Sequence, residues 1–545
     1  MADTQALIVG AGPVGLTLAI DLGRRGVRTQ LIERRNAPLR LPKMERSNPR
    51  TMEIYRRLGL SEKIRAAAYP ADVPMDVFIV RSLAEPSLVH LEYPAVVKAR
   101  AQIAARNDGG APREPYQLVS QYTLEAILLA EARQTPNVTV HLGTELDSFD
   151  AGDEGLIAQL RLGDGSSENV HSRYLVGCDG GGSTVRKQLG IRLEGRSRIA
   201  TVTNVFFRCD DLFEKSHVGP GRHYCFVGEG SGLGGVGGVL VVQDDRRHFA
   251  LHTTAPADSD MADVIRRTTG LSVDPEILYV GEWTQHLLVA ERYSAGRVFL
   301  AGDANHLYIP TGGLGMNTGI GDAIDLAWKL AGTLAGWGGP GLLASYGIER
   351  RGVALRNRDA VQWAMQGVLQ WRAAFTRRVF EDSPVGRQAR EDFVKLAAAG
   401  QARVYEMVGT ELGYRYESPI VCQEPEPAPA DEVSVYRSTT WPGARLPHVW
   451  LEDGSALLDR LGVAYTLLRL GGARADTGRI EHAFRDIGAP LDVLDVPDEP
   501  ARRVYERDLV LVRPDLHVVW RGNELPVDTL RLAAIATGRR PDRSN

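Results

Sequence analysis

The sequence predicts an α/β protein of several domains, because three blocks each combine an apolar strand, a glycine-rich turn and a helix. The blocks lie at residues 6–33, 174–191 and 296–330. The chain has 545 residues, 43% of them hydrophobic and 24% charged, which is enough for roughly three or four domains. Its 58 glycines exceed a tenth of the chain, and their clusters mark places where the backbone turns tightly or approaches a ligand.

The first block predicts a strand, a glycine turn, a helix and a second strand that ends in an acidic residue. It reads ALIVGAGPVG and continues into an apolar helix and an apolar strand. Gly10 permits the tight turn, Gly12 lets the backbone approach a pyrophosphate, and Gly15 lets the helix pack against the strand. Glu33 can accept hydrogen bonds from ribose hydroxyls. The block therefore predicts a Rossmann-type dinucleotide site and leaves NAD and FAD both open.

The other two blocks predict further glycine turns at the ends of apolar strands. The second, YLVGCDGGGSTVRKQLGI, places an Asp-Gly turn before a helix that carries Arg186. In the third, an apolar strand leads to Gly302 and Asp303, and a glycine-rich loop then opens a helix from about Met316 to Leu330. The N-terminus of that helix presents unpaired N–H groups, which suit an anion or the electron-rich edge of a ring.

The rest of the chain predicts an inserted sheet and a C-terminal domain. Residues 201–289 hold several strand-like runs, mostly antiparallel, and such an insertion is a natural place for a substrate pocket. The glycine run at 228–238 predicts a hairpin near that pocket. The segment QEPEPAPADE predicts a stiff linker. The predicted division is 1–195 and 291–422 for the two parts of the nucleotide-binding domain with its helical region, 196–290 for the inserted sheet, 423–432 for the linker, and 433–545 for a compact α/β domain.

Composition excludes several classes of partner. The formal charge of −4 offers no field to attract nucleic acid or an anionic membrane, and no run approaches the ~20 apolar residues of a membrane span. The four cysteines lie far apart without a CxxC motif, which disfavours disulfide frameworks and zinc sites and fits a reducing cytoplasm. The start of the chain lacks a leader-like pattern. We therefore expect a cytoplasmic protein that acts on a small molecule.

The three blocks in this order resemble the class A flavoprotein monooxygenases, the FAD-dependent aromatic hydroxylases. The resemblance rests on GxGxxG with Glu33, on the Cys178-Asp179-Gly180 turn, and on Gly302-Asp303 followed by GxGMN, and it covers residues 1 to about 420. The segments PGARLPHVWLEDG and LVRPDLHVVWRG are similar to the thioredoxin-like tail of the larger, phenol hydroxylase-like members. The resemblance implies a para-hydroxybenzoate hydroxylase-like FAD domain, an inserted sheet and a thioredoxin-like C-terminal domain. That tail has no CxxC motif, so a structural or dimer-forming role is expected.

The resemblance also implies a set of cofactor contacts. The implied FAD-binding residues are Gly10, Gly12, Pro13, Val14, Gly15, Glu33, Arg34, Lys43, Gln121, Leu146, Asp179, Asp303, Gly313, Gly315, Met316 and Asn317. Asp303 is expected at the ribityl chain, and the GxGMN loop at the pyrimidine edge of the flavin, where a helix N-terminus stabilises negative charge. NADH or NADPH is expected to approach Asp179 and Arg186. Lys43 stands where the family usually has arginine, and Ile309 replaces the first proline of GDAxHxxPP.

The implied reaction is reduction of FAD by NAD(P)H, addition of O₂ to give a C4a-hydroperoxide, and transfer of one oxygen to a phenolic ring. The protein has to exclude water and make the substrate phenolate-like, so a proton acceptor near the phenol is needed. Tyr224 and His286 are the preferred candidates. The other candidates in the inserted sheet are Arg222, His223, His252 and Gln285.

Other functions stay open at this point. A flavin-dependent halogenase would be expected to show a WxWxIP motif, and Trp283 has no such partner. An FAD-dependent reductase or epoxidase of a non-aromatic substrate and a non-enzymatic flavin-binding redox module are the remaining alternatives. A homodimer is expected for the hydroxylase.

Overall fold

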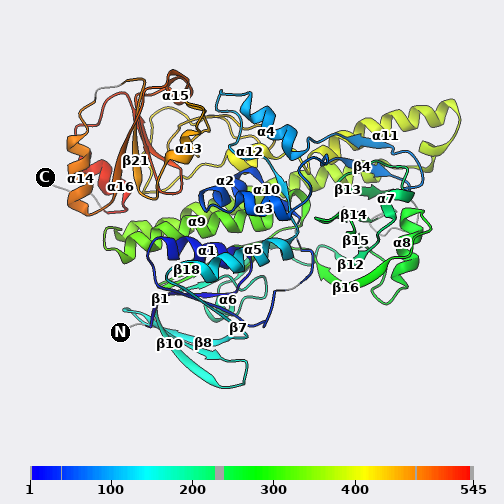
Figure 1. Cartoon of the computed structure of the whole chain (residues 1–545), viewed down its shortest axis with the longest axis horizontal. Helices are drawn as coiled ribbons and strands as arrows, with labels where there is room; N and C mark the ends of the chain where they lie inside the picture. Colours follow the sequence, from blue (N-terminus) through cyan, green and yellow to red (C-terminus); the bar gives the residue numbers. More distant parts are fainter. Residues whose placement is uncertain (1–2, 39, 44, 228–237, 473–474, 540–545) are drawn as a thin grey trace.

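The computed structural model describes residues 3–38, 40–43, 45–227, 238–472 and 475–539. Figure 1 shows three regions: a sheet near the N-terminus covered by long helices, a second sheet to the right, and a C-terminal domain at the upper left. The predicted hairpin at 228–238 falls almost entirely outside the described residues. Among the helices of the described residues, none has both the length and the apolar character needed to cross a bilayer.

The first sheet brings the three glycine-rich blocks to one edge. Its order is β18-β19-β10-β1-β2-β7, and β9 joins it by pairing with β10 and with β8. Strand β1 runs parallel to β2 and β10, and β10 runs parallel to β19. The carboxyl ends of β1, β10 and β19 therefore lie side by side, and the loop that follows each strand meets the others there. The strands are β1 (Thr4–Val9), β2 (Thr29–Glu33), β7 (Val138–Leu142), β8 (Glu145–Ala151), β9 (Leu156–Arg161), β10 (Ser167–Gly177), β18 (Ser294–Ala295) and β19 (Val298–Leu300).

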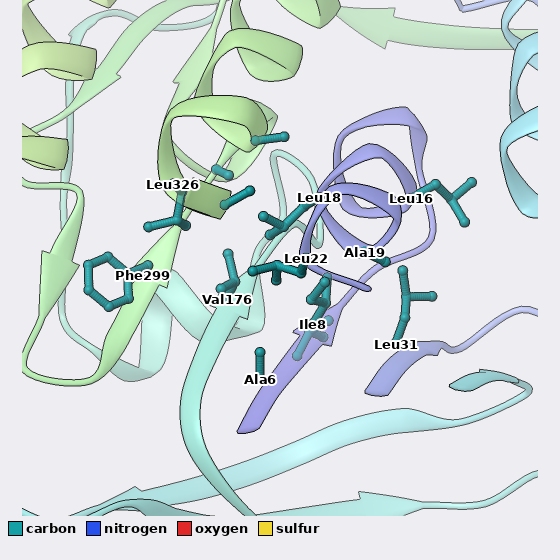
Figure 2. Packing of buried hydrophobic residues seen from close by; sticks show 14 of the residues in the cluster. Ala6, Ile8, Leu16, Leu18, Ala19, Leu22, Leu31, Val176, Phe299 and Leu326 are labelled. Atoms are coloured by element: carbon teal, nitrogen blue, oxygen red, sulfur yellow. The ribbon is translucent and has the colours of Figure 1, made fainter. Parts of the chain in front are cut away.

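Helices cover this sheet with apolar side chains. Figure 2 shows Ile8 of β1, Leu22 of α1 and Leu326 of α9 in one buried cluster. Because α1 packs closely against α9, the helices after the first and third blocks share one core. The helices of this region are α1 (Pro13–Arg24), α2 (Pro49–Arg57), α3 (Ser61–Ala67), α4 (Val96–Ala104), α5 (Gln121–Gln134), α6 (Thr184–Gln188), α9 (Leu314–Leu334) and α10 (Pro340–Ala374). The short strands are β3 (Arg46–Ser47) with β6 (Gln117–Leu118), and β11 (Leu193–Arg196), β17 (Leu287–Ala290) and β20 (His306–Leu307).

The second sheet is mostly antiparallel, as predicted, but it is not confined to residues 196–290. Its order is β16-β12-β15-β14-β13-β4-β5, and β4 pairs with β13 in parallel. The predicted boundary leaves out β4 and β5, because β4 lies more than a hundred residues before its partner β13 and β5 joins the sheet by pairing with β4. The strands are β4 (Val77–Val80), β5 (Val89–Leu91), β12 (Thr201–Arg208), β13 (His223–Phe226), β14 (Val239–Val242), β15 (His248–Thr253) and β16 (Glu276–Thr284). The helices beside it are α7 (Leu212–Lys215), α8 (Met261–Thr269) and α11 (Pro384–Ala402), whereas α12 (Val408–Leu412) packs against α2 and α10.

The C-terminal domain is a four-stranded sheet with helices packed on it. Its strand order is β22-β21-β23-β24, with β21 and β22 parallel and the other pairs antiparallel. The βαβαββα succession is the arrangement expected of a thioredoxin-like domain. Its elements are α13 (Leu457–Arg460), β21 (Tyr465–Leu470), α14 (Gly478–Ile487), β22 (Leu491–Val496), α15 (Glu499–Tyr505), β23 (Leu509–Val512), β24 (Val518–Gly522) and α16 (Thr529–Ala536).

The predicted linker at 423–432 contains no helix or strand, and side chains from the neighbouring regions hold it in place. Arg521 pairs with Glu424 at 2.7 Å, and Arg356 donates two hydrogen bonds to Asp431. The linker is therefore a fixed connection between the two domains.

Candidate flavin and substrate site

The first two glycine loops are in direct contact, and this contact requires glycine. Gly10 has a φ of +106°, and a Cβ there would lie 2.5 Å from the carbonyl oxygen of Cys178. A Cβ on Gly15 would overlap the carbonyl oxygen of Gly10. By contrast, a Cβ on Gly12 would meet no atom within 4 Å. The backbone at Gly12 therefore borders open space, as a pyrophosphate-binding turn should.

Glu33 lies at the end of β2 as an ionised, fixed carboxylate. It accepts hydrogen bonds from the Ala11 N–H at 3.0 Å and from Arg35 Nε at 2.7 Å. Burial acts to raise the pKa of Glu33, but the hydrogen bonds from Arg35 and Ala11 outweigh it and lower the pKa. Arg34 is exposed. Arg35, which the sequence did not single out, is the residue that pairs with Glu33.

The second loop is joined to the third by Arg186. Asp179 accepts hydrogen bonds from the N–H groups of Thr184 at 2.7 Å and Val185 at 3.2 Å, so its carboxylate stabilises the start of α6. Arg186 is 7% exposed and donates to the carbonyl oxygens of Gly181 and Ala304. Its guanidinium is thus a link between the loops, with little surface left for a nicotinamide cofactor.

Asp303 follows β19 and reaches into a recess in the protein. Its side chain is exposed to solvent, yet the surrounding protein raises its pKa, against the opposing charges of His306 and Lys43. Behind it, the Gly302 N–H donates to Asp322, which also contacts His306 at 2.9 Å. The third loop is therefore anchored from inside while Asp303 stays accessible.

The loop that opens α9 is held by Asn317 and by an arginine that the sequence analysis missed. Asn317 accepts from the Asn48 N–H at 2.9 Å and donates to the carbonyl oxygens of Arg46 and Gly313. The Arg46 guanidinium donates to the Gly312 carbonyl oxygen and to Glu411. A Cβ on Gly315 would meet no atom within 4 Å, so the start of α9 borders open space. The open backbone at Gly12 and Gly315 and the accessible carboxylate of Asp303 suit the contacts that FAD requires at these loops.

The remaining predicted cofactor residues lie around these loops. Pro13 and Val14 begin α1, and Val14 packs against Gly302. Gln121 begins α5 and donates to Glu125 at 2.7 Å. Leu146 is 3% exposed within the core of the first sheet, which leaves its backbone as the part available to a cofactor. The other two positions show less constraint: Met316 is half-buried and Lys43 is exposed.

A group of polar residues, most of them buried, lies beside the loop that opens α9. We call it the His223 cluster: Glu45, Arg46, Arg222, His223 and Tyr405. His223 Nδ1 lies 2.7 Å from the Tyr405 hydroxyl, and its Nε2 lies 3.3 Å from Glu45 Oε1. Arg222 is 4% exposed and stacks 4.3 Å from the centre of the Tyr405 ring. Within the described residues, Arg222 has no carboxylate at ion-pair distance, and its buried Nε has no hydrogen-bond partner.

The charges in the His223 cluster set the protonation states of His223 and Glu45. Burial lowers the pKa of His223, and nearby Arg222 and Arg46 lower it further, although Glu45 opposes them. Burial acts to raise the pKa of Glu45, but His223, Arg222 and Arg46 together lower it to about 2. The cluster therefore holds a neutral imidazole beside an ionised carboxylate at neutral pH.

Neither preferred candidate for the proton acceptor joins this cluster. The Tyr224 hydroxyl donates to the Gly219 carbonyl oxygen at 2.7 Å and accepts from the Gly221 N–H at 2.8 Å. Its ring stacks on Phe78 in the core of the second sheet. The backbone therefore occupies both the donor and the acceptor function of the Tyr224 hydroxyl, which indicates a structural role. His286 is half-buried beyond the end of β16, where its Nδ1 lies 3.2 Å from Ser197 Oγ.

Three glycine loops at the carboxyl ends of neighbouring parallel strands define a dinucleotide-binding enzyme, and the residues at these loops suit FAD. Two family models match the chain: "FAD binding domain" over residues 3–361 and "Aromatic-ring hydroxylase, C-terminal" over residues 439–538. The FAD-dependent monooxygenase apdD of Emericella nidulans is 32% identical over 95% of this chain and 87% of its own length. The 2,4-dichlorophenol 6-monooxygenase of Cupriavidus pinatubonensis is 30% identical over 96% and 94%.

Solved structures of similar proteins indicate the same family. RebC with bound 7-carboxy-K252c has a TM-score of 0.89 and 33% identity, and the flavin-dependent monooxygenase PieE with FAD and substrate has a TM-score of 0.89 and 31% identity. Both comparisons cover 98% of this chain and 99% of the other. The chain belongs to the class A FAD-dependent monooxygenases, the flavoprotein aromatic hydroxylases. Its predicted fold class, its FAD cofactor and its enzyme class are confirmed.

Proposed function

We propose that this monooxygenase hydroxylates a phenolic aromatic ring bound between the GxGMN loop and strand β13. The observation that carries the proposal is Arg222, a buried guanidinium without a carboxylate partner among the described residues. A buried, unpaired charge is costly, and an anionic ligand removes that cost. A phenolate supplies the missing charge and is also the form of a phenol that reacts most readily with an electrophilic oxygen.

His223 is the proposed proton acceptor. It is neutral near pH 7 because burial lowers its pKa, and its Nε2, which has no hydrogen-bond partner among the described residues, can take the phenol proton. Glu45, whose pKa is lowered to about 2, then stabilises the imidazolium that forms. The Tyr405 hydroxyl contacts Nδ1 of His223 and fixes the orientation of the imidazole. Arg222 and Arg46 stabilise the resulting phenolate.

For FAD, we propose the contacts implied by the sequence, with Arg46 added at the GxGMN loop. Bound FAD would supply the redox chemistry, which is acceptance of a hydride from NADH or NADPH and activation of O₂. Gly12 would hold its pyrophosphate, Asp303 its ribityl chain, and the start of α9 the edge of the flavin. The anchored loops keep these contacts in place and limit the entry of water.

Asp303→Ala tests the placement of the cofactor. We expect the purified variant to lose most of its flavin absorbance, because Asp303 is the accessible acceptor in the recess. Asp258→Ala, which removes an exposed carboxylate from the turn between β15 and α8, is the control and should keep its flavin. Equal flavin content in Asp303→Ala and wild type would refute the placement.

His223→Gln tests the reaction. Substituted phenols should accelerate NADH or NADPH oxidation by the wild type and give hydroxylated products, and the variant should lose about 10²–10⁴-fold in kcat. His248→Gln is the matched control, because His248 lies on the same sheet and pairs with Asp245 near the surface. A variant with wild-type kcat would remove His223 from the mechanism. If no phenol accelerates the oxidation in wild type, the non-aromatic reductase or redox-module alternative is favoured instead.

We further propose a cytoplasmic homodimer. The four cysteines are free, which supports a reducing compartment. The C-terminal domain has no cysteine pair for redox exchange, which supports a structural or dimer-forming role. Light scattering of the purified protein checks the oligomeric state, and a monomer at micromolar concentration would contradict it.

A further inference from the structure

A cavity of about 480 Å³ lies between the FAD-binding domain and the C-terminal domain. It is bordered by α1, α2 and α3 on one side and by the segment 458–463 and the 514–515 loop on the other, and its lining includes none of the three glycine loops. In Figure 1 the C-terminal domain lies beside α2 and α9. A volume of this size is typical of sites for small molecules.

Five arginines line this cavity: Arg24, Arg25, Arg50, Arg56 and Arg57. Three of them have close carboxylate partners: Arg24 with Glu131 at 2.6 Å, Arg25 with Asp21 at 3.1 Å, and Arg56 with Asp459 at 2.7 Å. These charges are satisfied within the protein, so they do not call for a ligand.

Arg50 and Arg57 are less well satisfied. Arg50 is 6% exposed and lies 3.7 Å from Glu53. Its Nη2 donates to the carbonyl oxygen of Asp515 at 2.8 Å, while its buried Nε has no hydrogen-bond partner. Arg57 donates to the carbonyl oxygen of Gly462 at 2.7 Å, while its buried Nη1 has no partner. Within the described residues no carboxylate lies at ion-pair distance from Arg57. Burial, followed by the charges of Arg25 and Arg50, lowers the pKa of Arg57 to about 10.

We propose that this cavity binds a small anion, a phosphate or a carboxylate on an apolar body, through Arg57 and Arg50. Guanidinium groups bind both anions in a bidentate, charge-assisted manner. The apolar body would lie against Ile54, Leu58 and Leu461, which line the same cavity. The bound anion would hold the two domains together, because the two sides of the cavity come from different domains. This site is separate from the proposed aromatic site and does not depend on it.

The test uses the full-length enzyme with FAD bound, so that the pyrophosphate turn is already filled. Inorganic phosphate and, separately, hexanoate are titrated by calorimetry at constant ionic strength. At least one of the two should bind, and Arg57→Gln should weaken that binding by about tenfold or more. The probe that binds more tightly identifies the head group. Arg28→Gln, which removes one exposed arginine outside the cavity, is the control and should bind as the wild type does.

Val463→Glu provides a second variant that leaves the buried contacts intact. Val463 is 62% exposed at the cavity, and its carbonyl oxygen accepts from Arg25, so a glutamate there would compete with the anion. Weaker binding in this variant, with an unchanged melting temperature, would support the site. The proposal is overturned if neither probe binds the wild type, or if Arg57→Gln and Arg28→Gln bind equally well.

Discussion

Two regions of this enzyme bury charged groups, and they differ in whether those charges are paired. The first is a network between the FAD-binding and C-terminal domains, which we call the domain network: Asp325, Lys329, Glu349, Arg513 and Asp515. Lys329 contacts Asp325 at 2.7 Å and Glu349 at 2.6 Å, and Arg513 contacts all three carboxylates within 2.8 Å. The second is the His223 cluster, in which Arg222 lacks a carboxylate partner. The domain network is complete in the protein alone, whereas we propose that a ligand completes the His223 cluster.

The difference indicates a rule for reading buried charges in this fold. A buried pair gains little net stability when complete, but removal of one partner leaves the other charge unsatisfied and is strongly destabilising. A charge without a partner raises the energy of the free protein and lowers it again only when an anion binds. Paired residues should therefore control folding, and unpaired residues should control affinity.

Arg513→Met should have the largest effect on stability. It leaves Glu349, Asp325 and Asp515 partly unpaired in a buried region, so we expect a loss of about 3–5 kcal/mol in the free energy of unfolding. Denaturant unfolding of the holoenzyme measures this loss. Arg469→Met removes the partly exposed pair with Asp495 and should cost no more than about 1 kcal/mol. Equal losses in the two variants would break the distinction between buried and surface pairs.

Acid should weaken the domain network through His517. Burial lowers the pKa of His517 to about 4, although Asp515 opposes the shift. The unfolded chain, with a histidine pKa of about 6.5, therefore binds more protons between pH 6.5 and 4. The contribution of His517 is unchanged above pH 6.5 and falls as the pH drops towards 4, by about 3 kcal/mol in all. Asp325, whose pKa is raised to about 7 by burial, changes stability in the opposite direction over part of this range.

His517→Gln isolates this contribution. Unfolding of the variant should depend less steeply on pH between 6.5 and 4 than unfolding of the wild type. His252 and His448, with pKa values also lowered to about 4 by burial, keep part of the acid sensitivity in the variant. His482→Gln, at an exposed position of α14, should leave the slope unchanged. Parallel curves for His517→Gln and wild type would rule out His517 as the acid-sensitive group.

The glycine loops could be predicted from the sequence because each is a local pattern. A strand, a turn and a helix within about 30 residues fix the geometry of Gly10, Gly12 and Gly15, and the parallel strand order then brings the three loops together. The Asp303 turn follows the same logic. For these parts, spacing along the chain was sufficient.

The His223 cluster could not be predicted in the same way, because its members are far apart in sequence. Glu45, His223 and Tyr405 come from three separate segments, and no spacing relates them. Tyr224 and His223 are neighbours on β13, so their side chains point to opposite faces of the sheet. The sequence does not show which of these faces lies towards the loop that opens α9.

Arg222→Gln separates affinity from folding, with a smaller effect than the changes above. Because Arg222 has no carboxylate partner, its removal should leave the free energy of unfolding equal to or above that of wild type. The loss of one charge-assisted hydrogen bond to a phenolate should raise KM for the phenol by about 10–100-fold. Arg247→Gln, on an exposed turn of the same sheet, is the matched control. If Arg222→Gln unfolds as readily as Arg513→Met and binds substrate normally, Arg222 belongs with the structural charges and the phenolate site must be sought elsewhere.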